Sequence, residues 1–162
     1  MSTYNKQTID DSQAEFVFSR HTFECKRCSR CCRKEPGIVM LTEKDVNGLL
    51  NNLNMNLKEF IEKCCREVYR DDKIYIGLKE KSNYDCVFWG SAGCIVYKDR
   101  PVQCRTFPFW PGLAQSDEDW EQEKRRCPGL DSGGDTFTLE QKMGMYMEEK
   151  NAVYMEMPDF EN

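Results

Sequence analysis

Apolar residues recur at helical spacing in three parts of the chain, and each part begins with a residue suited to cap a helix. Thr42 is followed three residues later by an acidic residue, and one apolar face follows it, comprising Val46, Leu49, Leu50 and Leu53. A second helix is predicted from an Asn56 cap to about Arg70, with apolar positions at Leu57, Phe60, Ile61, Cys64, Cys65 and Val68. Thr138 caps a last helix, whose apolar face comprises Leu139, Met143, Tyr146 and Met147.

Two other stretches have the pattern of extended chain. Ile74, Ile76 and Leu78 alternate with less apolar positions, which predicts a strand or an extended edge segment. Residues 86–89 and 94–97 flank the turn-forming sequence 90–93, so a short β-hairpin is expected there. A short helix is expected near Pro101, with Asp99 as its cap.

The remaining stretches predict little regular structure. Residues 1–20 are polar and are predicted to form a loosely ordered N-terminal arm, while residues 112–135 are predicted to be mostly loop. Residues 21–162 are predicted to be one cysteine-cluster domain. The expected fold class is therefore α+β: a small single domain with irregular loops, a short β-hairpin and about three to four helices.

Charge and hydropathy exclude several classes of partner. The 162 residues carry a formal net charge of −5, which offers no basic surface for nucleic acid or for an anionic membrane. Apolar runs are far shorter than a membrane span. Residues 1–11 lack the basic and apolar regions of a secretory signal, so a cytoplasmic location is expected.

That location affects the interpretation of the ten cysteines. In a reducing compartment, clustered cysteines are more often thiolate metal ligands than disulfides. Four of them, Cys25, Cys28, Cys31 and Cys32, fall within eight residues. Bridges among residues so close in sequence would add little stability by closing loops, so metal ligation is the better interpretation.

The spacing of the first four cysteines is compatible with two kinds of metal centre. Three cysteines at i, i+3 and i+6 match the spacing in bacterial ferredoxins, where a later ligand precedes proline, as Cys127 does here. This predicts a [4Fe–4S] cluster held by Cys25, Cys28 and Cys31. Zinc is the main alternative, because a Cys-x2-Cys knuckle suits a tetrahedral ion. The side chains of Cys31 and Cys32 are expected to diverge and to serve two sites.

A second group of cysteines follows later in the chain. A hairpin would bring Cys86 close to Cys94, and the turn near Pro101 would return Cys104 to them. With the first motif and Cys127, these residues give eight candidate thiolates, enough for two four-ligand sites that would staple the irregular loops. Arg100 and Arg105 are candidates to donate hydrogen bonds to the sulfurs, or else to form surface salt bridges.

Several motifs in the same order resemble a known family. They are Phe23-x-Cys25-x2-Cys28-x2-Cys31-Cys32-Arg33, Leu41-Thr42-Glu43-Lys44-Asp45-Val46, Cys86-Val87-Phe88, Cys94-Ile95-Val96-Tyr97 and Arg100-Pro101-Val102-Gln103-Cys104-Arg105-Thr106-Phe107-Pro108-Phe109. This chain is similar to the YkgJ family of bacterial and archaeal cysteine-cluster proteins, regarded as chelators of zinc or iron. The resemblance implies metal binding through the eight cysteines but no particular reaction. A flagellin lysine methyltransferase with a related motif and an iron–sulfur cluster favours iron.

Three further cysteine and histidine residues have simpler interpretations. Cys64 and Cys65 lie at helical spacing from Phe60 and Ile61, which is typical of core packing, although a redox or accessory-ligand role stays open. His21, the single histidine, is expected to be solvated at the edge of the arm.

Three functional classes follow from these patterns. The first is an iron–sulfur protein in a redox or methyl-transfer role. The others are a zinc-stapled interaction module and a metal carrier. A protein partner and enzymatic activity both stay open.

Overall fold

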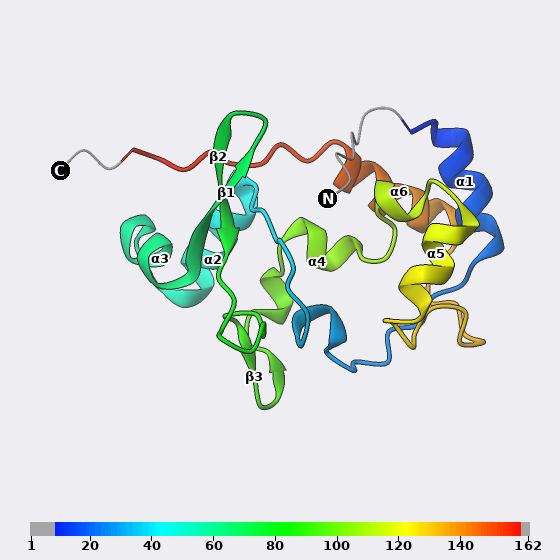
Figure 1. Ribbon diagram of the computed structural model, residues 1–162, viewed down its shortest axis with the longest axis horizontal. Helices are drawn as coiled ribbons and strands as arrows, with labels where there is room; N and C mark the ends of the chain where they lie inside the picture. Colours follow the sequence, from blue (N-terminus) through cyan, green and yellow to red (C-terminus); the bar gives the residue numbers. More distant parts are fainter. Residues whose placement is uncertain (1–8, 160–162) are drawn as a thin grey trace. The chain divides into compact units, whose positions relative to one another are not determined.

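The computed structural model describes residues 9–159 and has the α+β architecture expected from the sequence (Figure 1). Six α-helices and two short antiparallel sheets are present in this range. The chain divides into two compact units that are interleaved along the sequence. The first unit comprises the chain up to Arg30 and residues 106–152, and the second comprises residues 31–105 and the segment that begins at Val153.

The first unit is helical and has an aromatic core. Its elements are α1 (Asp11–Arg20), the 3-10 helix η4 (Pro111–Leu113), α5 (Asp117–Lys124) and α6 (Leu139–Lys150). The ring of Phe18 lies 5.3 Å from that of Phe109, 6.0 Å from that of Trp120 and 5.9 Å from that of Tyr146. All four side chains are buried, so aromatic contacts supply much of this core.

Helix α1 corrects the prediction of a loosely ordered arm over residues 11–20. Asp10 caps it by accepting a hydrogen bond from the backbone N–H of Ser12. Ala14, Val17 and Phe18 are buried at the i, i+3, i+4 spacing of one helix face. The apolar run of residues 16–18 has no clear helical period, because Phe16 is exposed between the buried positions, so the pattern was too weak to predict this helix. Residues 1–8 of the predicted arm lie outside the described range.

Helix α5 corrects the prediction of loop over residues 112–135. Ser116 caps the helix by accepting a hydrogen bond from the N–H of Asp119, and Trp120 is its only buried residue. Because one large side chain anchors an otherwise charged helix, the sequence shows no apolar periodicity here. The helix α6 and its Thr138 cap are confirmed, and the structure adds reciprocal hydrogen bonds between Thr138 and Gln141.

The second unit combines helices with both sheets. Its elements are α2 (Glu43–Leu53), α3 (Leu57–Cys64), β1 (Cys65–Arg70), β2 (Lys73–Leu78), β3 (Trp89–Gly90), β4 (Gly93–Cys94) and the 3-10 helix η3 (Tyr97–Asp99). The short helices η2 (Arg30–Cys32) and α4 (Val102–Thr106) lie at its two boundaries in the sequence. Its buried core comprises Leu41, Val46, Leu49, Phe60, Cys64, Cys65, Ile76, Leu78, Phe88 and Val96.

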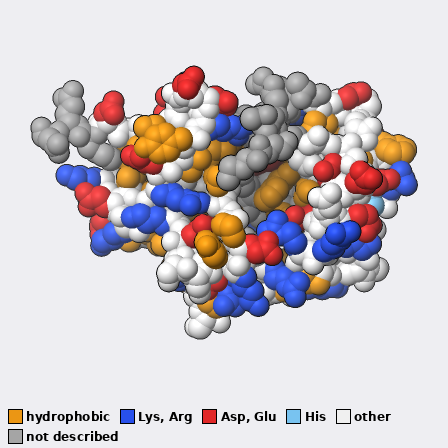
Figure 2. Space-filling view, viewed as in Figure 1, with side chains coloured by type: hydrophobic (Ala, Val, Ile, Leu, Met, Phe, Trp, Pro, Cys, Tyr) orange, Lys and Arg blue, Asp and Glu red, His pale blue; other side chains and the backbone are white. Residues whose placement is uncertain are grey.

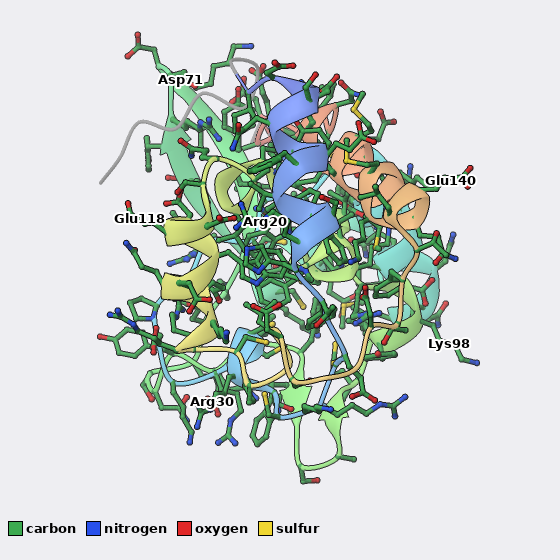
Figure 3. The ribbon with its side chains drawn as sticks, turned by 90° about the vertical axis from the view of Figure 1, so that its right-hand side faces the viewer. Arg20, Arg30, Asp71, Lys98, Glu118 and Glu140 are labelled. Atoms are coloured by element: carbon green, nitrogen blue, oxygen red, sulfur yellow. The ribbon has the colours of Figure 1, made fainter. Side chains whose placement is uncertain are left out.

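The predicted caps of α2 and α3 are confirmed, but the predicted end of the second helix is wrong. Asn56 accepts a hydrogen bond from the N–H of Glu59 and starts α3. The helix stops at Cys64, and the next six residues form β1 instead of continuing to Arg70. Asp71 and Asp72 have φ values of 50° and 58°, which suits the tight turn of a β-hairpin. Figures 1 and 3 show this hairpin, with Asp71 at its tip.

Strand β2 lies at the centre of the hydrogen bonding in this unit. It pairs with β1 on one side, in the register Cys65↔Leu78 to Arg70↔Lys73. The carbonyl of Ile76 accepts a hydrogen bond from Leu41, and its N–H donates to Met155 in the returning C-terminal segment. The predicted hairpin at residues 86–97 is also present, in a shorter form in which β3 pairs with β4.

The surface is charged, with both signs mixed. Figure 2 shows Lys and Arg side chains interspersed with Asp and Glu on the face in view. Within residues 9–159, no helix combines the length and apolar character that crossing a membrane requires.

Candidate metal centre

All ten cysteines are free thiols, and the eight candidate ligands divide between the two units. Cys25, Cys28 and Cys127 belong to the first unit, whereas Cys31, Cys32, Cys86, Cys94 and Cys104 belong to the second. The second unit therefore contains enough thiols for a four-coordinate site.

The side chains of Cys31 and Cys32 lie together at the end of η2. Their sulfur atoms are 3.7 Å apart, so the expected divergence of these two side chains is wrong. Two thiolates on one tetrahedral zinc ion are about 3.8 Å apart, given Zn–S bonds of about 2.3 Å. The separation is thus suited to two ligands of the same ion.

The hairpin formed by β3 and β4 presents the next two cysteines. The backbone N–H of Phe88 donates to the sulfur of Cys86, and the N–H of Val96 donates to that of Cys94. Each donor follows its cysteine by two residues. Burial is the largest cause of the raised pKa of both thiols, and these hydrogen bonds oppose it by stabilising the thiolate.

A backbone hydrogen bond connects this hairpin segment to the first motif. The N–H of Cys86 donates to the carbonyl of Cys32 over 2.7 Å. Residues 31–32 and residue 86 are therefore held side by side, although more than fifty residues separate them in the chain.

Cys104 completes the group from α4. Burial is the largest cause that raises the pKa of its thiol, and negative charge on Cys86, Cys31 and Cys94 raises it further. The Arg100 guanidinium opposes this by favouring the thiolate.

Cys32 is coupled to the same set of thiols. Its hydrogen bond with Cys31 is the largest cause of its raised pKa, followed by burial and by the charges of Cys31, Cys104 and Cys86. The five thiols of the second unit are therefore electrostatic neighbours. Burial and the charge of neighbouring thiolates both raise the thiol pKa of Cys32, Cys86, Cys94 and Cys104 above its ordinary value.

The sulfurs do not yet have the arrangement of a bound ion. Among residues 9–159, no three Cys, His, Asp or Glu side chains already stand at distances that hold a metal. Metal binding by this group consequently requires the sulfurs to come closer to a common centre than they are here.

The helix that carries Cys104 is fixed at both neighbouring residues. The side-chain oxygen of Gln103 accepts a hydrogen bond from the N–H of Met40 at 2.6 Å. Arg105 donates to the buried carboxylate of Asp45 at 3.0 Å. The salt bridge predicted for Arg105 is therefore present, but its partner is the buried carboxylate of Asp45 and not an acidic residue at the surface.

Arg100 has a different environment. Its Nε donates to the carbonyl of Tyr97 at 2.9 Å, and its guanidinium lies 3.7 Å from the centre of the Tyr97 ring. Its charge favours the thiolate forms of Cys94 and Cys104. The arginine thus offsets part of the negative charge that the thiolates would gather.

In the first unit, Cys25 lies in a segment that pairs with the residues after Cys127. Phe23 forms an antiparallel bridge with Leu130, and the N–H of Glu24 donates to the carbonyl of Gly129 at 3.0 Å. A Cβ atom at residue 129 would lie 2.5 Å from the carbonyl oxygen of Glu24, so glycine permits this close approach. The Cys-Pro-Gly sequence is therefore adjacent to the segment of Cys25.

Cys64 and Cys65 lie in the core of the second unit, as the packing interpretation predicted. Burial, together with the charge of Cys64, raises the pKa of Cys65 to about 12. A thiol in this state is a poor nucleophile, because the thiolate is the reactive form.

The prediction of a solvated His21 is wrong. Its side chain is 12% exposed, and its ring nitrogens lie 3.1 Å from carboxylate oxygens of Asp117 and Asp131. The ring also stacks on Trp120, with 4.9 Å between centroids. Figure 3 shows the neighbouring Arg20 at the end of α1, from which it pairs with Asp117. Nothing in the local sequence indicated these distant partners.

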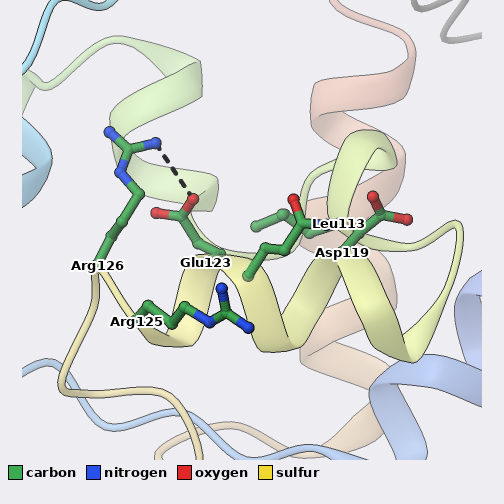
Figure 4. Close-up of a pocket in the computed structure, with 6 residues that line it drawn as sticks. Leu113, Asp119, Glu123, Arg125 and Arg126 are labelled. Carbon is green, nitrogen blue, oxygen red and sulfur yellow. Dashed lines mark hydrogen bonds and ion pairs between the residues drawn. The ribbon is translucent and has the colours of Figure 1, made fainter.

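A surface hollow in the first unit is unrelated to the cysteines. Its volume is about 500 Å³, and it is lined by Leu113, Asp119, Gln122, Glu123, Arg125 and Arg126 (Figure 4). Arg126 lies 3.5 Å from Glu123, so part of its charge is offset within the hollow.

The cysteine pattern corresponds to a known sequence family. A sequence model of the CxxCxxCC family, described as a putative zinc- or iron-chelating domain, matches residues 24–128. The chain belongs to the CxxCxxCC family. The match includes all eight cysteines proposed as ligands and excludes α1 and α6. No solved structure matches the chain.

Proposed function

We propose that this CxxCxxCC protein chelates a zinc or iron ion through four of the five thiols of its second unit. The observation that carries the proposal is the 3.7 Å separation of the Cys31 and Cys32 sulfurs, beside the thiols of Cys86, Cys94 and Cys104. The family description supports the same two metals.

The residues suit such an ion in their chemistry. Thiolates are soft ligands that bind zinc and iron strongly, and backbone N–H groups already point to the sulfurs of Cys86 and Cys94. An ion with four protein ligands has no open position, and it supplies folding energy in place of catalysis. The chain's own contribution is to gather and orient the thiols.

The number of thiols favours a single ion that can be exchanged. A four-coordinate ion leaves one of the five thiols unbound, and that thiol could take part in transferring the ion to a partner protein. The zinc-stapled module and the metal carrier are therefore two uses of one site. A reducing compartment, such as the cytoplasm, would keep these thiols free. With a net charge of −5, nucleic acid is not the expected partner.

An iron–sulfur protein is the second candidate. The Cys-Pro-Gly sequence at residues 127–129 pairs with the segment of Cys25 within the first unit, which supports Cys127 as a ligand alongside Cys25 and Cys28. The ferredoxin-like spacing of the sequence alone adds Cys31 to this cluster. Cys32, Cys86, Cys94 and Cys104 would then form a separate site. A redox or methyl-transfer role belongs to this candidate.

Metal analysis of variants distinguishes the two candidates. The protein is purified without oxygen from iron-replete cells, and its zinc, iron and acid-labile sulfide are measured. If a single ion binds in the second unit, the protein should contain about one metal per chain and no labile sulfide. The double variant Cys25→Ser/Cys28→Ser should keep this metal, and Cys32→Ser/Cys104→Ser should lose it. About four irons and four sulfides, lost in Cys25→Ser/Cys28→Ser, would favour the cluster.

A further inference from the structure

Arg33 contacts the neighbours of two cysteines that are far from it in the sequence. Its Nε lies 3.2 Å from a carboxylate oxygen of Asp85, the residue before Cys86. Its guanidinium carbon lies 3.6 Å from the centre of the Trp89 ring. Trp89 is paired with Cys94 across the β3–β4 ladder. One side chain directly after Cys32 therefore reaches the flanks of both hairpin cysteines.

The carboxylate that Arg33 contacts is itself firmly placed. The Asp85 side chain is 5% exposed, and it accepts a second hydrogen bond from the side-chain amide of Asn83 at 3.0 Å. The N–H of Asp85 donates to the amide oxygen of the same asparagine at 3.2 Å. An ion pair with a fixed, buried carboxylate restricts the arginine more than an exposed pair would.

We infer that Arg33 is a positioning residue for the metal site, which fixes the Cys31–Cys32 segment against the β3–β4 hairpin before metal binds. This inference rests on the proposed function. The arginine acts together with the hydrogen bond from the N–H of Cys86 to the carbonyl of Cys32. Because the sulfurs must still come together around a common centre, a fixed backbone limits how far each of them has to move.

The shape of the arginine side chain is essential to this role. Its planar guanidinium can stack on the Trp89 ring and pair with Asp85 at the same time. A lysine keeps the charge but has no plane to stack, so it can satisfy only one of the two contacts well. Arg33→Lys therefore keeps the positive charge at this position while removing the geometry that would position the two segments.

The test uses Co²⁺ as the probe, because its thiolate complexes absorb in the visible and near-ultraviolet. Co²⁺ affinity is measured by competition with a chelator, in parallel with the free energy of unfolding of the metal-free protein. The variants are Arg33→Lys, Trp89→Leu and Arg70→Ala. Arg70 is the matched control, because it lies on β1 of the same unit and pairs with the exposed Asp71.

Arg33→Lys is expected to weaken Co²⁺ binding by about 10- to 100-fold, as losses of residues that orient metal ligands do, and to lower the stability of the metal-free protein by less than this change in affinity corresponds to. Trp89→Leu should have a smaller effect in the same direction, and Arg70→Ala none. The inference is overturned if Arg33→Lys binds as wild type does, or if the loss of affinity merely equals a loss of stability. If the wild-type protein gives no cobalt–thiolate absorption, the proposed function itself fails.

Discussion

The Asp45 carboxylate lies 3.0 Å from the Arg105 guanidinium, although sixty residues separate them in the chain. The same carboxylate oxygen accepts a hydrogen bond at 3.0 Å from the N–H of Val102, the first residue of α4. The other oxygen accepts from the N–H of Thr42 and completes the capping box of α2. One buried side chain thus caps the helix it belongs to and also the helix that carries Cys104.

This double role predicts that Asp45→Asn destabilises the protein by about 2 kcal/mol, the range for hydrogen bonds to a charged group. An amide has one acceptor oxygen and cannot serve both helices. Urea unfolding of the metal-free protein measures the change. Glu43→Gln on the exposed face of α2 is the control and should change stability by less than about 0.5 kcal/mol. Equal stability of wild type and Asp45→Asn would contradict the double capping role.

Two cysteines of the second unit are predicted to respond differently to substitution. Cys104→Ser should lower the metal content, because a hydroxyl is a poor ligand for a soft metal. Cys64→Ala should leave it intact and cost about 1 kcal/mol of packing, since Cys64 lies in the core. Elemental analysis and urea unfolding measure both quantities. If Cys64→Ala lost its metal as completely as Cys104→Ser, Cys64 would have a role in metal binding besides its role in the core.

Asp131 predicts a pH dependence of stability in the first unit. Burial raises the pKa of its carboxyl, but hydrogen bonds from the Thr22 backbone, His21 and Lys124 outweigh burial and hold it below 3.8. A depressed pKa adds stability above the unfolded value, and that stability is lost as the pH falls through the folded pKa. Asp131→Asn should therefore be less stable than wild type at pH 7, by about 1.5–3 kcal/mol.

The difference in the free energy of unfolding between wild type and Asp131→Asn should shrink steadily as the pH is lowered from about 5 towards the folded pKa of Asp131. Denaturant unfolding of the metal-free proteins at several pH values measures it. Asp159→Asn is the control, because Asp159 is exposed and should give no such difference. A difference in the free energy of unfolding that stays constant down to acidic pH would mean that Asp131 stabilises the fold without its charge.

Removing the metal should destabilise the fold. A structural ion adds its binding free energy to the free energy of folding, while the metal-free protein keeps the buried cores of both units. Chelator treatment under reducing conditions should lower the melting temperature by about 10 °C or more, since each kcal/mol corresponds to about 2–4 °C in a chain of this size. Equal melting temperatures with and without chelator would exclude a structural role for the metal.

Much of the second unit could be predicted because its signals are local. Thr42 and Asn56 mark the starts of α2 and α3 by the spacing to their own first turns, and the glycines of residues 90–93 mark a hairpin. The end of α3 was missed because Cys65 and Val68 suit a helix face and a strand equally well. Pairing with β2 decides between them, and helical periodicity does not reveal that pairing.

The residues that support the candidate site could not be predicted in the same way. Asp45 was recognised as part of a helix cap, but its contacts with Val102 and Arg105 are made across sixty residues. His21 was expected in solvent, yet its partners lie about a hundred residues away. Side-chain contacts between distant segments depend on how the elements pack, and single-residue propensities contain no such information.

X-ray absorption at the metal edge of Cys25→Ser/Cys28→Ser, purified without oxygen, tests the proposed second-unit site most directly. These two substitutions leave all five thiols of that unit in place. The account predicts four sulfur ligands at about 2.3 Å from a single ion and no neighbouring metal. Scattering from a second metal, or a first shell dominated by nitrogen and oxygen, would contradict it.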